Sequence, residues 1–346
     1  MKLLIVTQAV DSDASALGFF VEWLREFAVQ CEEVHVIAFK TGRHDLPSNV
    51  HVHPVRVAPQ DGRLRRLFRY WSLLWEVLPQ VDAVFTHMSP EYLIAAAPFV
   101  LTAGKPVIHW YAHREVTWRL RLATLIADHV ATSTANAFRL KSGNVLLLGQ
   151  GIPTDLFLPV ASVTKEPRLL TVGRITPIKG LEMMIEAFAE VRQSLPDATL
   201  DLYGEPMLAS DFDYERRLKT RVTELGLGEA VRFRGPVAFS DFARLYASYA
   251  VALNAAPTGA PDKSVLEAMS CGVPVVVVNQ TFVELLGPEA EACVAEAAPR
   301  ALAAKVIGIL QGDATELGRR LRVIVEEKHS LKKLIARLIA AYEEIR

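Results

Sequence analysis

Residues 171–180 have the sequence Thr-Val-Gly-Arg-Ile-Thr-Pro-Ile-Lys-Gly, which predicts a strand, a loop and a helix in the second half of the chain. A β-branched strand over residues 168–172 leads into a loop, and a helix with apolar residues at helical spacing follows over residues 181–194. Glycine at the strand end lets backbone approach a ligand closely, and Arg174 and Lys179 suit one anion such as a diphosphate. The alternative interpretation is an ordinary surface loop with two solvated cations.

The same alternation of short β-branched runs and helical stretches occurs throughout the chain and predicts an α/β protein with two doubly wound, Rossmann-like domains. The strands expected in the first half are residues 3–7, 34–38, 83–86, 107–110, 129–132 and 145–148. Those expected in the second half are residues 168–172, 199–203, 231–234, 251–254 and 274–278. We expect the carboxyl ends of both sheets to face each other across a cleft, because such sheets bind ligands at that edge.

The composition between residues 149 and 167 suits an interdomain linker, since glycine, proline and polar residues dominate it. The predicted domains are residues 1–160 and 161–329, with the boundary near residue 160. The last helix, residues 330–346, repeats apolar residues at helical spacing, and we expect it to pack back onto the first domain.

Length and composition exclude several classes of protein. The chain has 346 residues, enough for two domains, and its 51% hydrophobic and 22% charged residues exclude wholesale disorder. The net charge of −1 provides no global field that would attract nucleic acid. Three cysteines without paired spacing and an N-terminal apolar run too short for a signal peptide predict a cytoplasmic protein.

A second informative segment is residues 262–276, Asp-Lys-Ser-Val-Leu-Glu-Ala-Met-Ser-Cys-Gly-Val-Pro-Val-Val, which predicts a short helix, a glycine stop and a buried strand. A helix N-terminus offers unpaired N–H groups and partial positive charge to phosphate oxygens. Glu267 can accept two hydrogen bonds from the vicinal hydroxyls of a ribose. The alternative is a capping box, in which the side chains of Ser264 and Glu267 bond to amides of their own helix.

Together these segments resemble the C-terminal domain of the retaining glycosyltransferases of family 4, which have the GT-B fold. The matching stretches are residues 172–174 with 179–180, residues 233–236 (Phe-Arg-Gly-Pro) and residues 266–276. In the first half the resemblance continues through Gly18, residues 111–114 (Tyr-Ala-His-Arg) and residues 151–157. It implies an acceptor-binding first domain and a second domain that binds the nucleotide sugar.

The resemblance also implies roles for individual residues. Arg174 and Lys179 would hold the donor diphosphate, Glu267 the nucleotide ribose, and His113 would lie near the reacting sugar. The residues 8–18 would approach the phosphates and the acceptor. The donor-binding set implied in this way also includes Gly18, Gly173, Gly204, Arg234, Asp262, Lys263, Ser264 and Val265. For His113, an ordinary hydrogen-bonded polar residue beyond a strand is the alternative.

The sequence departs from the family at one position. The family has a second glutamate eight residues before the one matching Glu267, and Gly259 stands there. Asp262 either replaces that carboxylate or caps the helix, and capping is slightly favoured. The sugar of the donor therefore stays open. Lys263 beside it opposes the helix dipole unless an anion is bound there.

We expect no metal ion and no cofactor besides the nucleotide sugar itself, with UDP, GDP or ADP as its nucleotide. The Asp-x-Asp motifs at residues 11–13 and 211–213 are interpreted as incidental, the second because acidic residues favour a first helical turn. His51 and His53 alternate with apolar residues, as in a strand with one solvated face, and are not expected to bind metal.

Two segments of the first half bear on the acceptor. His87 and Glu91 follow a strand and are candidate acceptor contacts, the alternative being a helix that starts at Pro90. Residues 63–75 combine four arginines with Phe68 and three larger aromatic residues, which is typical of a helix lying on an anionic membrane. An ordinary surface helix is the alternative; nucleic acid is not expected as a partner.

The favoured hypothesis is a retaining, metal-independent hexosyltransferase of the kind used in polysaccharide biosynthesis. It would move a sugar from a nucleoside diphosphate to a hydroxyl of a saccharide or lipid-linked acceptor. A non-catalytic nucleotide-sugar-binding protein and a sugar-nucleotide epimerase of the same fold remain as alternatives. A dehydrogenase is disfavoured, because the first strand and helix lack the Gly-x-Gly-x-x-Gly pattern.

Overall fold

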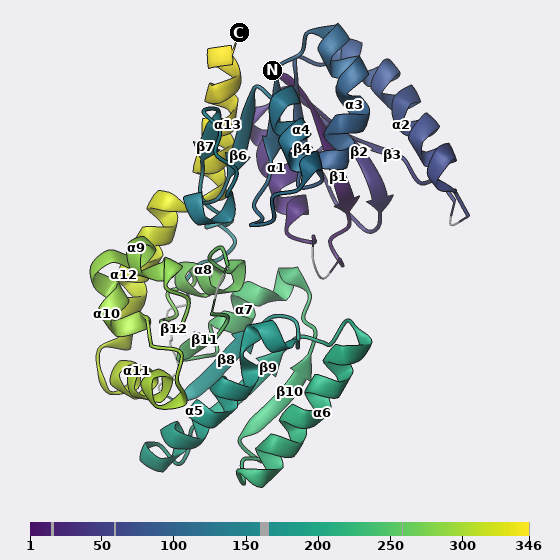
Figure 1. Cartoon of the computed structure of the whole chain (residues 1–346). Helices are drawn as coiled ribbons and strands as arrows, with labels where there is room; N and C mark the ends of the chain where they lie inside the picture. The colour runs from purple at the N-terminus through teal and green to yellow at the C-terminus, as the bar shows by residue number, and fades with distance from the viewer. Residues whose placement is uncertain (15–16, 59, 160–165, 258, 346) are drawn as a thin grey trace. The chain divides into compact units, whose positions relative to one another are not determined.

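The computed structural model describes residues 1–14, 17–58, 60–159, 166–257 and 259–345 (Figure 1). Its contacts divide the chain into two compact units: Met1–Gly151 with Ser330–Arg346, and Ile152–His329. The change of unit at residue 151 precedes the boundary near residue 160 that the sequence predicts. Residues 160–165 of the predicted linker lie outside the described residues.

The first unit contains a seven-stranded parallel sheet with the order β3-β2-β1-β4-β5-β6-β7. Its central strands are buried on both faces, which explains their near-continuous apolar sequences. The strands are β1 (Lys2–Val10), β2 (Glu33–Thr41), β3 (Val50–Pro54), β4 (Ala83–His87), β5 (Val107–Trp110), β6 (His129–Thr132) and β7 (Val145–Leu147).

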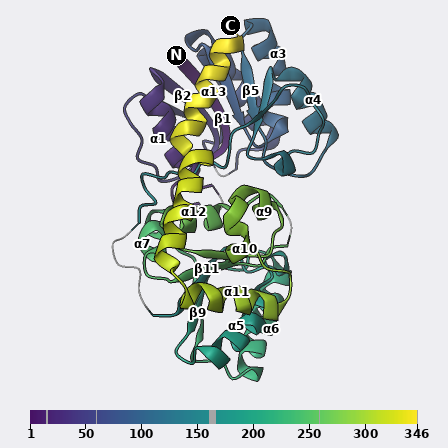
Figure 2. The same cartoon turned by 90° about the vertical axis from the view of Figure 1, so that its left-hand side faces the viewer.

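Helices cover both faces of this sheet. On one face, α2 (Arg63–Val77), α3 (Pro90–Ala103) and α4 (Trp118–Ile126) pack against a core that includes Leu4 and Val84. On the other, α1 (Phe20–Gln30) and α13 (Leu331–Ile345) pack against Leu3 and Ile5. Figure 2 shows α1 and α13 on one side of β1 and α3 and α4 on the other. Short 3₁₀ helices, η1 (Leu78–Gln80) and η2 (Ala135–Ala137), complete the unit.

The C-terminal helix α13 belongs to the core of this first unit. Its buried residues Leu334, Leu338 and Tyr342 share a hydrophobic cluster with Trp23 of α1. The Tyr342 hydroxyl donates a hydrogen bond of 2.6 Å to the carbonyl oxygen of Val84. The two ends of the chain are therefore joined in one domain, and the helix that the sequence places at residues 330–346 lies in its core.

The second unit contains a five-stranded parallel sheet with the order β10-β9-β8-β11-β12 around a separate core. Its strands are β8 (Arg168–Val172), β9 (Thr199–Tyr203), β10 (Val231–Gly235), β11 (Val251–Asn254) and β12 (Val275–Val277). Its helices are η3 (Pro177–Lys179), α5 (Leu181–Ser194), α6 (Ala209–Glu224), η4 (Phe239–Asp241), α7 (Phe242–Tyr246), α8 (Lys263–Ser270), α9 (Thr281–Leu286), η5 (Gly287–Glu289), α10 (Ala290–Cys293), α11 (Pro299–Gln311) and α12 (Ala314–Lys328). The prediction of two doubly wound α/β domains is confirmed.

Each sheet has one point where the strand order reverses, which in such folds is where ligands bind. In the second unit β8 lies between β9 and β11, so the segments that follow β8 and β11 leave the sheet next to each other. In the first unit the corresponding strands are β1 and β4. Among the described residues, no helix has both the length and the apolar character needed to cross a membrane.

Candidate functional site

The loop after β8 is built by close backbone approaches. Gly173 donates a hydrogen bond of 2.9 Å to the carbonyl of Tyr203, and the side chain of Lys179 lies against Gly173. Gly204 has a φ of +139°, and a Cβ there would overlap the carbonyl oxygen of Gly173. Gly180 has a φ of +64°, and a Cβ there would overlap the carbonyl oxygen of Ala255. Both positions require glycine, so the loop is held tightly at the sheet edge.

The lysine of this loop contacts the start of α8. Lys179 Nζ lies 2.8 Å from Oδ2 of Asp262, and the amide of Asn254 donates to the same oxygen at 2.6 Å. Asp262 is the N-cap residue of α8, and Asn254 ends β11. The Asp262 carboxylate thus bonds to side chains from the segment after β8 and from the end of β11. Within the described helix α8 it accepts no capping hydrogen bond, which corrects the slight preference for a capping role. Lys179 lies at the reversal point of the sheet, beside a helix N-terminus.

Arg174 is exposed and lies near the N-terminus of α6. Burial raises the pKa of Asp211, but the backbone amide of Leu208, the Thr176 hydroxyl and the charge of Arg174 lower that pKa below its usual value. The Asp211 carboxylate accepts a bond of 3.1 Å from the Leu208 amide at the start of α6. Arg174 is therefore a solvent-accessible cation on the loop that carries Lys179.

Glu267 is buried in α8, with 4% of its surface exposed. Its Oε2 accepts a hydrogen bond of 3.5 Å from the hydroxyl of Tyr246, which ends α7. Burial raises the pKa of Glu267 to about 7, against the opposing effects of the Lys263 charge and the Tyr246 bond. Because the N-cap of α8 is Asp262, Ser264 is not at the N-cap, and the capping-box alternative for Ser264 and Glu267 is wrong.

The remaining candidates of α8 lie in its first turn. Lys263 and Ser264 are half-buried, whereas Val265 is buried in the core. Burial lowers the pKa of the Lys263 ammonium, and the carboxylate of Glu267 opposes that shift. The helix therefore begins with a cation whose charge is disfavoured by its surroundings, and a bound anion would favour that charge.

Arg234 differs from the other candidates, because its side chain is held by a buried carboxylate. Its Nε donates to Oδ1 of Asp201 at 2.8 Å, and the Tyr249 hydroxyl donates to Oδ2 at 2.6 Å. Asp201 is fully buried in the middle of β9. This bond raises the pKa of Arg234. The structure thus gives Arg234 a carboxylate partner within its own domain, and its role in donor binding stays a prediction.

In the first unit, His113 is exposed beyond the carboxyl end of β5. Its Nδ1 accepts a bond of 3.2 Å from the Glu115 amide, and its ring meets Tyr111 edge-on with centroids 6.3 Å apart. The backbone N–H of Gly18 donates to the Ala14 carbonyl at 2.8 Å, but residues 15–16 of the same predicted loop lie outside the described residues. His113 is therefore a solvent-exposed side chain beyond the carboxyl end of β5.

His87 is buried, which contradicts its predicted role as an acceptor contact. Its ring stacks on Phe20 with centroids 4.1 Å apart, and its Nδ1 lies 3.3 Å from the Thr7 hydroxyl. Only 1% of His87 is exposed. Glu91 lies in the first turn of α3, is exposed and pairs with Arg119 at 3.6 Å. The acceptor-facing candidate that remains accessible on this segment is Glu91.

The Asp-x-Asp motifs have local partners. Asp13 pairs with Arg43 at 2.6 Å, and Asp213 pairs with Arg216. His51 and His53 of β3 lie beside a third histidine, His35. The Nδ1 atom of His35 is 3.2 Å from Nε2 of His53, and the His35 and His51 rings have centroids 5.0 Å apart. Across the described part of the chain, no group of three or more His, Cys, Asp or Glu side chains is arranged to hold a metal ion.

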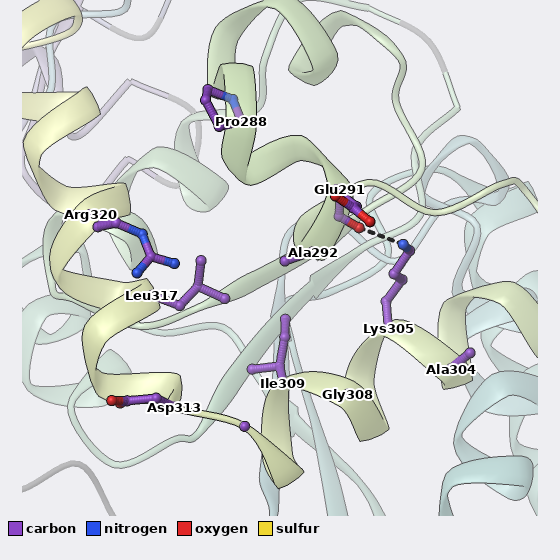
Figure 3. Close-up of a pocket in the computed structure, with 11 residues that line it drawn as sticks. Pro288, Glu291, Ala292, Ala304, Lys305, Gly308, Ile309, Asp313, Leu317 and Arg320 are labelled. Carbon is purple, nitrogen blue, oxygen red and sulfur yellow. Dashed lines mark hydrogen bonds between the residues drawn. The ribbon is translucent and has the colours of Figure 1, made fainter.

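Figure 3 shows a groove in the second unit that contains none of the candidate residues. Its volume is about 640 Å³, and α11 and α12 contribute Lys305, Ile309 and Leu317 to its lining. Lys305 donates to the backbone carbonyl of Glu291 there. The groove lies between α10, α11 and α12, and its lining includes no residue of the segments after β8 and β11 that carry Lys179 and Asp262.

The sequence analysis did not identify Asn254, which bonds to Asp262, or Tyr246, which bonds to Glu267. Asn254 could have been noticed, because a polar residue ends an apolar strand beside the predicted edge. Tyr246 carries no such signal, since an aromatic residue on a short helix ordinarily predicts core packing.

Part of the second unit matches a known protein family. Residues 166–312 match the family described as Glycosyl transferases group 1. The second unit therefore carries a glycosyl transferases group 1 domain, and the resemblance inferred from the sequence is confirmed at this level.

Two known proteins are similar to this chain over less than half of its length. One is the UDP-N-acetylglucosamine--peptide N-acetylglucosaminyltransferase GtfA subunit of Streptococcus gordonii, 27% identical over 146 residues, which are 38% of this chain and 27% of that protein. The other is the mannosylfructose-phosphate synthase of Agrobacterium fabrum, 28% identical over 155 residues, 40% of this chain and 34% of that protein. The matches span about a third of the length of these relatives.

Solved structures match the whole chain. The Anabaena protein HepE in complex with UDP and glucose has a TM-score of 0.77 at 20% identity, covering 99% of both chains. Sucrose-phosphate synthase from Thermosynechococcus elongatus has a TM-score of 0.77 at 19% identity, covering 99% of this chain and 98% of the other. At these identities the likeness shows the fold, which is the GT-B fold that the sequence predicted.

Proposed function

We propose that this protein is a glycosyltransferase that moves a sugar from a nucleoside diphosphate to a hydroxyl group of an acceptor. The observation that carries the proposal is the position of Lys179, 2.8 Å from the N-cap residue of α8 at the reversal point of the second sheet. The same helix carries the buried Glu267. A cation, a helix N-terminus and a carboxylate at one sheet edge are the groups that a nucleoside diphosphate needs.

Lys179 and Arg174 would stabilise the departing diphosphate. In the reaction the bond between the anomeric carbon and the β-phosphate oxygen breaks, and the electron pair goes to the diphosphate. The acceptor oxygen bonds to the anomeric carbon, and its proton passes to the departing diphosphate oxygen. Fixed positive charge aimed at the oxygen that becomes negative lowers the barrier of such a step. We propose on this basis that the reaction is metal-independent.

Glu267 would hold the ribose of the nucleotide. Its carboxylate is buried and has a single hydroxyl donor, Tyr246, at 3.5 Å in the described structure. Two ribose hydroxyls would add donors to a carboxylate whose charge burial disfavours, so the ribose would stabilise the ionised form. The half-buried Asp262 would then be released from Lys179 to contact sugar hydroxyls, in place of the carboxylate missing at Gly259.

We further propose that the configuration of the sugar is retained, with the acceptor entering on the face that the diphosphate leaves. His113 would lie near the reacting sugar and the accessible Glu91 near the acceptor. The names of relatives include UDP-N-acetylglucosamine and GDP-mannose, which supports a nucleoside diphosphate sugar and leaves the base open. A saccharide or lipid-linked acceptor, polysaccharide biosynthesis and a cytoplasmic, peripheral location complete the proposal.

The test is nucleotide release from UDP-, GDP- and ADP-sugars in the presence of EDTA, with and without a panel of saccharide acceptors. We expect acceptor-dependent release of one nucleoside diphosphate and its loss in Lys179→Ala. Lys219→Ala is the matched control, because Lys219 is an exposed lysine of the same unit. Nucleotide-sugar binding without release would favour the non-catalytic alternative, and acceptor-independent release with epimerised sugar would favour the epimerase.

A further inference from the structure

The strand β3 (Val50–Pro54) is the outer strand of the seven-stranded sheet, and in the described structure it pairs with β2 alone (Figure 1). Its Val50 and Val52 side chains are half-buried and pack against the core that α1 and α13 cover. None of the five residues of β3 is fully buried. Because little apolar surface anchors this edge strand, polar contacts on its other face help to hold it on β2.

Three histidines lie on that other face. Val34 and Val36 of β2 belong to the core beside α1, so the alternation of a strand turns His35 to the opposite face, together with His51 and His53 of β3. The Nδ1 atom of the buried His35 lies 3.2 Å from Nε2 of His53. The ring centroid of His35 lies 5.0 Å from that of His51 and 5.4 Å from that of His53. These three residues form the histidine cluster of the sheet edge.

The contact between His35 and His53 limits the number of protons that the pair can hold. In a hydrogen bond between two imidazole nitrogens, one nitrogen carries the hydrogen and the other accepts it through a lone pair. When both facing nitrogens carry a hydrogen, the bond is lost, and two positive rings with centroids 5.4 Å apart repel each other. A charged His51 adds a third positive ring 5.0 Å from His35. The packing of the histidine cluster therefore favours neutral rings.

Neighbouring charges only partly offset a positive charge on His35. Its Nε2 lies 3.7 Å from Oε2 of Glu33, and the same oxygen lies 3.1 Å from Nζ of Lys2 in β1. Burial lowers the pKa of His35, the charge of His51 adds to this shift, and Glu33 opposes it. Because Lys2 shares the carboxylate of Glu33, that carboxylate compensates a charged His35 incompletely.

The other charges that face His53 come from α2, which packs on this side of the sheet. They are the carboxylate of Glu76 and the guanidinium of Arg69, which have opposite signs. Burial lowers the pKa of His53, and the charge of His35 adds to this shift. Glu76 raises that pKa, whereas His51 and Arg69 lower it further. Burial and the neighbouring histidines together favour a neutral His53.

We propose that His35, His51 and His53 form an acid-sensitive latch, which holds β3 on β2 at neutral pH and releases it when the cluster takes up protons. The pKa values of His35 and His53 both lie below the ordinary value of 6.5. The stabilising contribution of the neutral rings is therefore complete above about pH 6.5 and is lost as the pH falls below it. Release of β3 would uncover the outer backbone edge of β2. The latch includes none of the residues proposed to bind donor or acceptor, so it does not depend on the proposed function.

The experiment is amide hydrogen exchange of the full-length protein at about pH 7.5 and about pH 5, with rates corrected for the chemical effect of pH. One set of peptides covers residues 50–54, and the internal reference is β4 at the centre of the same sheet. We expect the protection of β3 to fall at least about tenfold on acidification and that of β4 to fall less than about twofold. Equal loss of protection in both strands, or no loss in β3, overturns the proposal.

His53→Gln isolates the proton uptake, because a glutamine amide can bond to His35 but takes up no proton. At neutral pH we expect the protection of residues 50–54 to stay within about twofold of the wild type, and on acidification its loss should be at least about fivefold smaller. His44→Gln is the matched control at an exposed histidine of the same unit, and it should keep the wild-type response.

His51→Gln is a second variant, which removes one ring charge and leaves the bond between His35 and His53 in place. It should also reduce the response to acid, and it carries the test if His53→Gln lowers the melting temperature at neutral pH. A wild-type response in both His53→Gln and His51→Gln contradicts the latch. Loss of the response in His44→Gln contradicts it as well, because the effect would then not belong to the histidine cluster.

Discussion

Lys179 Nζ and Asp262 Oδ2 lie 2.8 Å apart and join the loop after β8 to the N-cap residue of α8. The lysine is thus neutralised by a carboxylate that also accepts a bond from Asn254. A diphosphate that binds Lys179 has to replace this carboxylate or share the lysine with it. Breaking the Lys179–Asp262 ion pair therefore weakens diphosphate binding, and a substitution at Asp262 removes this effect.

Asp262→Asn should strengthen the binding of a free nucleoside diphosphate by about 3- to 10-fold, because a negative charge next to the phosphates disappears while an amide can still contact Asn254. Calorimetric titration measures the effect. Asp213→Asn, at an exposed carboxylate of the same unit, serves as the control and should leave affinity unchanged. Weaker binding in Asp262→Asn would mean that the carboxylate chiefly orients Lys179.

Glu267→Gln should separate stability from binding. Burial raises the pKa of Glu267 from 4.5 to about 7, so folding favours the protonated carboxyl. That stabilising contribution is complete below about pH 4.5 and is lost as the pH rises toward 7. Between pH 5 and 7, roughly, the wild-type melting temperature should fall by about 2–5 °C relative to that of Glu267→Gln.

The same variant should bind nucleoside diphosphate at least about tenfold more weakly, because its amide accepts less strongly from ribose hydroxyls. Melting curves across pH and a titration at one pH make the two measurements. The comparison stays below pH 7, because the lowered pKa of Lys263 acts in the opposite sense above it. A variant with parallel melting curves and unchanged affinity would contradict the role of Glu267.

Gly204→Ala should destabilise the second unit by at least about 2 kcal/mol, since a Cβ would overlap the Gly173 carbonyl at a left-handed φ. Chemical denaturation measures the loss. Gly228→Ala is the control: among the described residues, none lies within 4 Å of a Cβ built at Gly228. Equal stability of the two variants would show that the loop at Gly173 yields easily.

His113→Ala should lower the transfer rate by about 100-fold or more while nucleoside diphosphate affinity changes less than about twofold. The reason is that His113 belongs to the first unit, whereas the groups proposed to hold the diphosphate belong to the second. His44→Ala removes another exposed histidine of the same unit and should retain full activity. A parallel loss of affinity and rate in His113→Ala would move this residue to the donor site.

The sequence predicted the regular elements closely, because β-branched runs and helical apolar spacing are local signals. The strand at residues 168–172 and the helix at residues 181–194 have the predicted bounds. The first strand, Lys2–Val10, is longer than the predicted residues 3–7. The polar residues Thr7 and Gln8 interrupt the apolar run, so the sequence indicated an earlier end of the strand. The strand β3, Val50–Pro54, is not among the expected strands. The alternation of His51 and His53 with apolar residues nevertheless indicates a strand there.

The partners of polar side chains could not be predicted in the same way. Asp262 was expected to cap its own helix, yet it bonds to Lys179, which is 83 positions away in the chain. His87 was expected to face an acceptor, but it stacks on Phe20. Such outcomes depend on which strands become neighbours, and local sequence carries no record of that arrangement. The motif around Lys179 indicated the right edge of the sheet because the segments that follow β8 and β11 both carry polar residues.

A diphosphate site at Lys179 is tested by titration calorimetry of UDP, GDP and ADP, in the presence of EDTA, on the wild type, Lys179→Ala and Lys219→Ala. We expect one nucleoside diphosphate to bind the wild type and Lys219→Ala equally and Lys179→Ala at least about tenfold more weakly. Equal affinity of all three proteins for that nucleotide, or binding of none of the three nucleotides, would contradict a diphosphate site at Lys179.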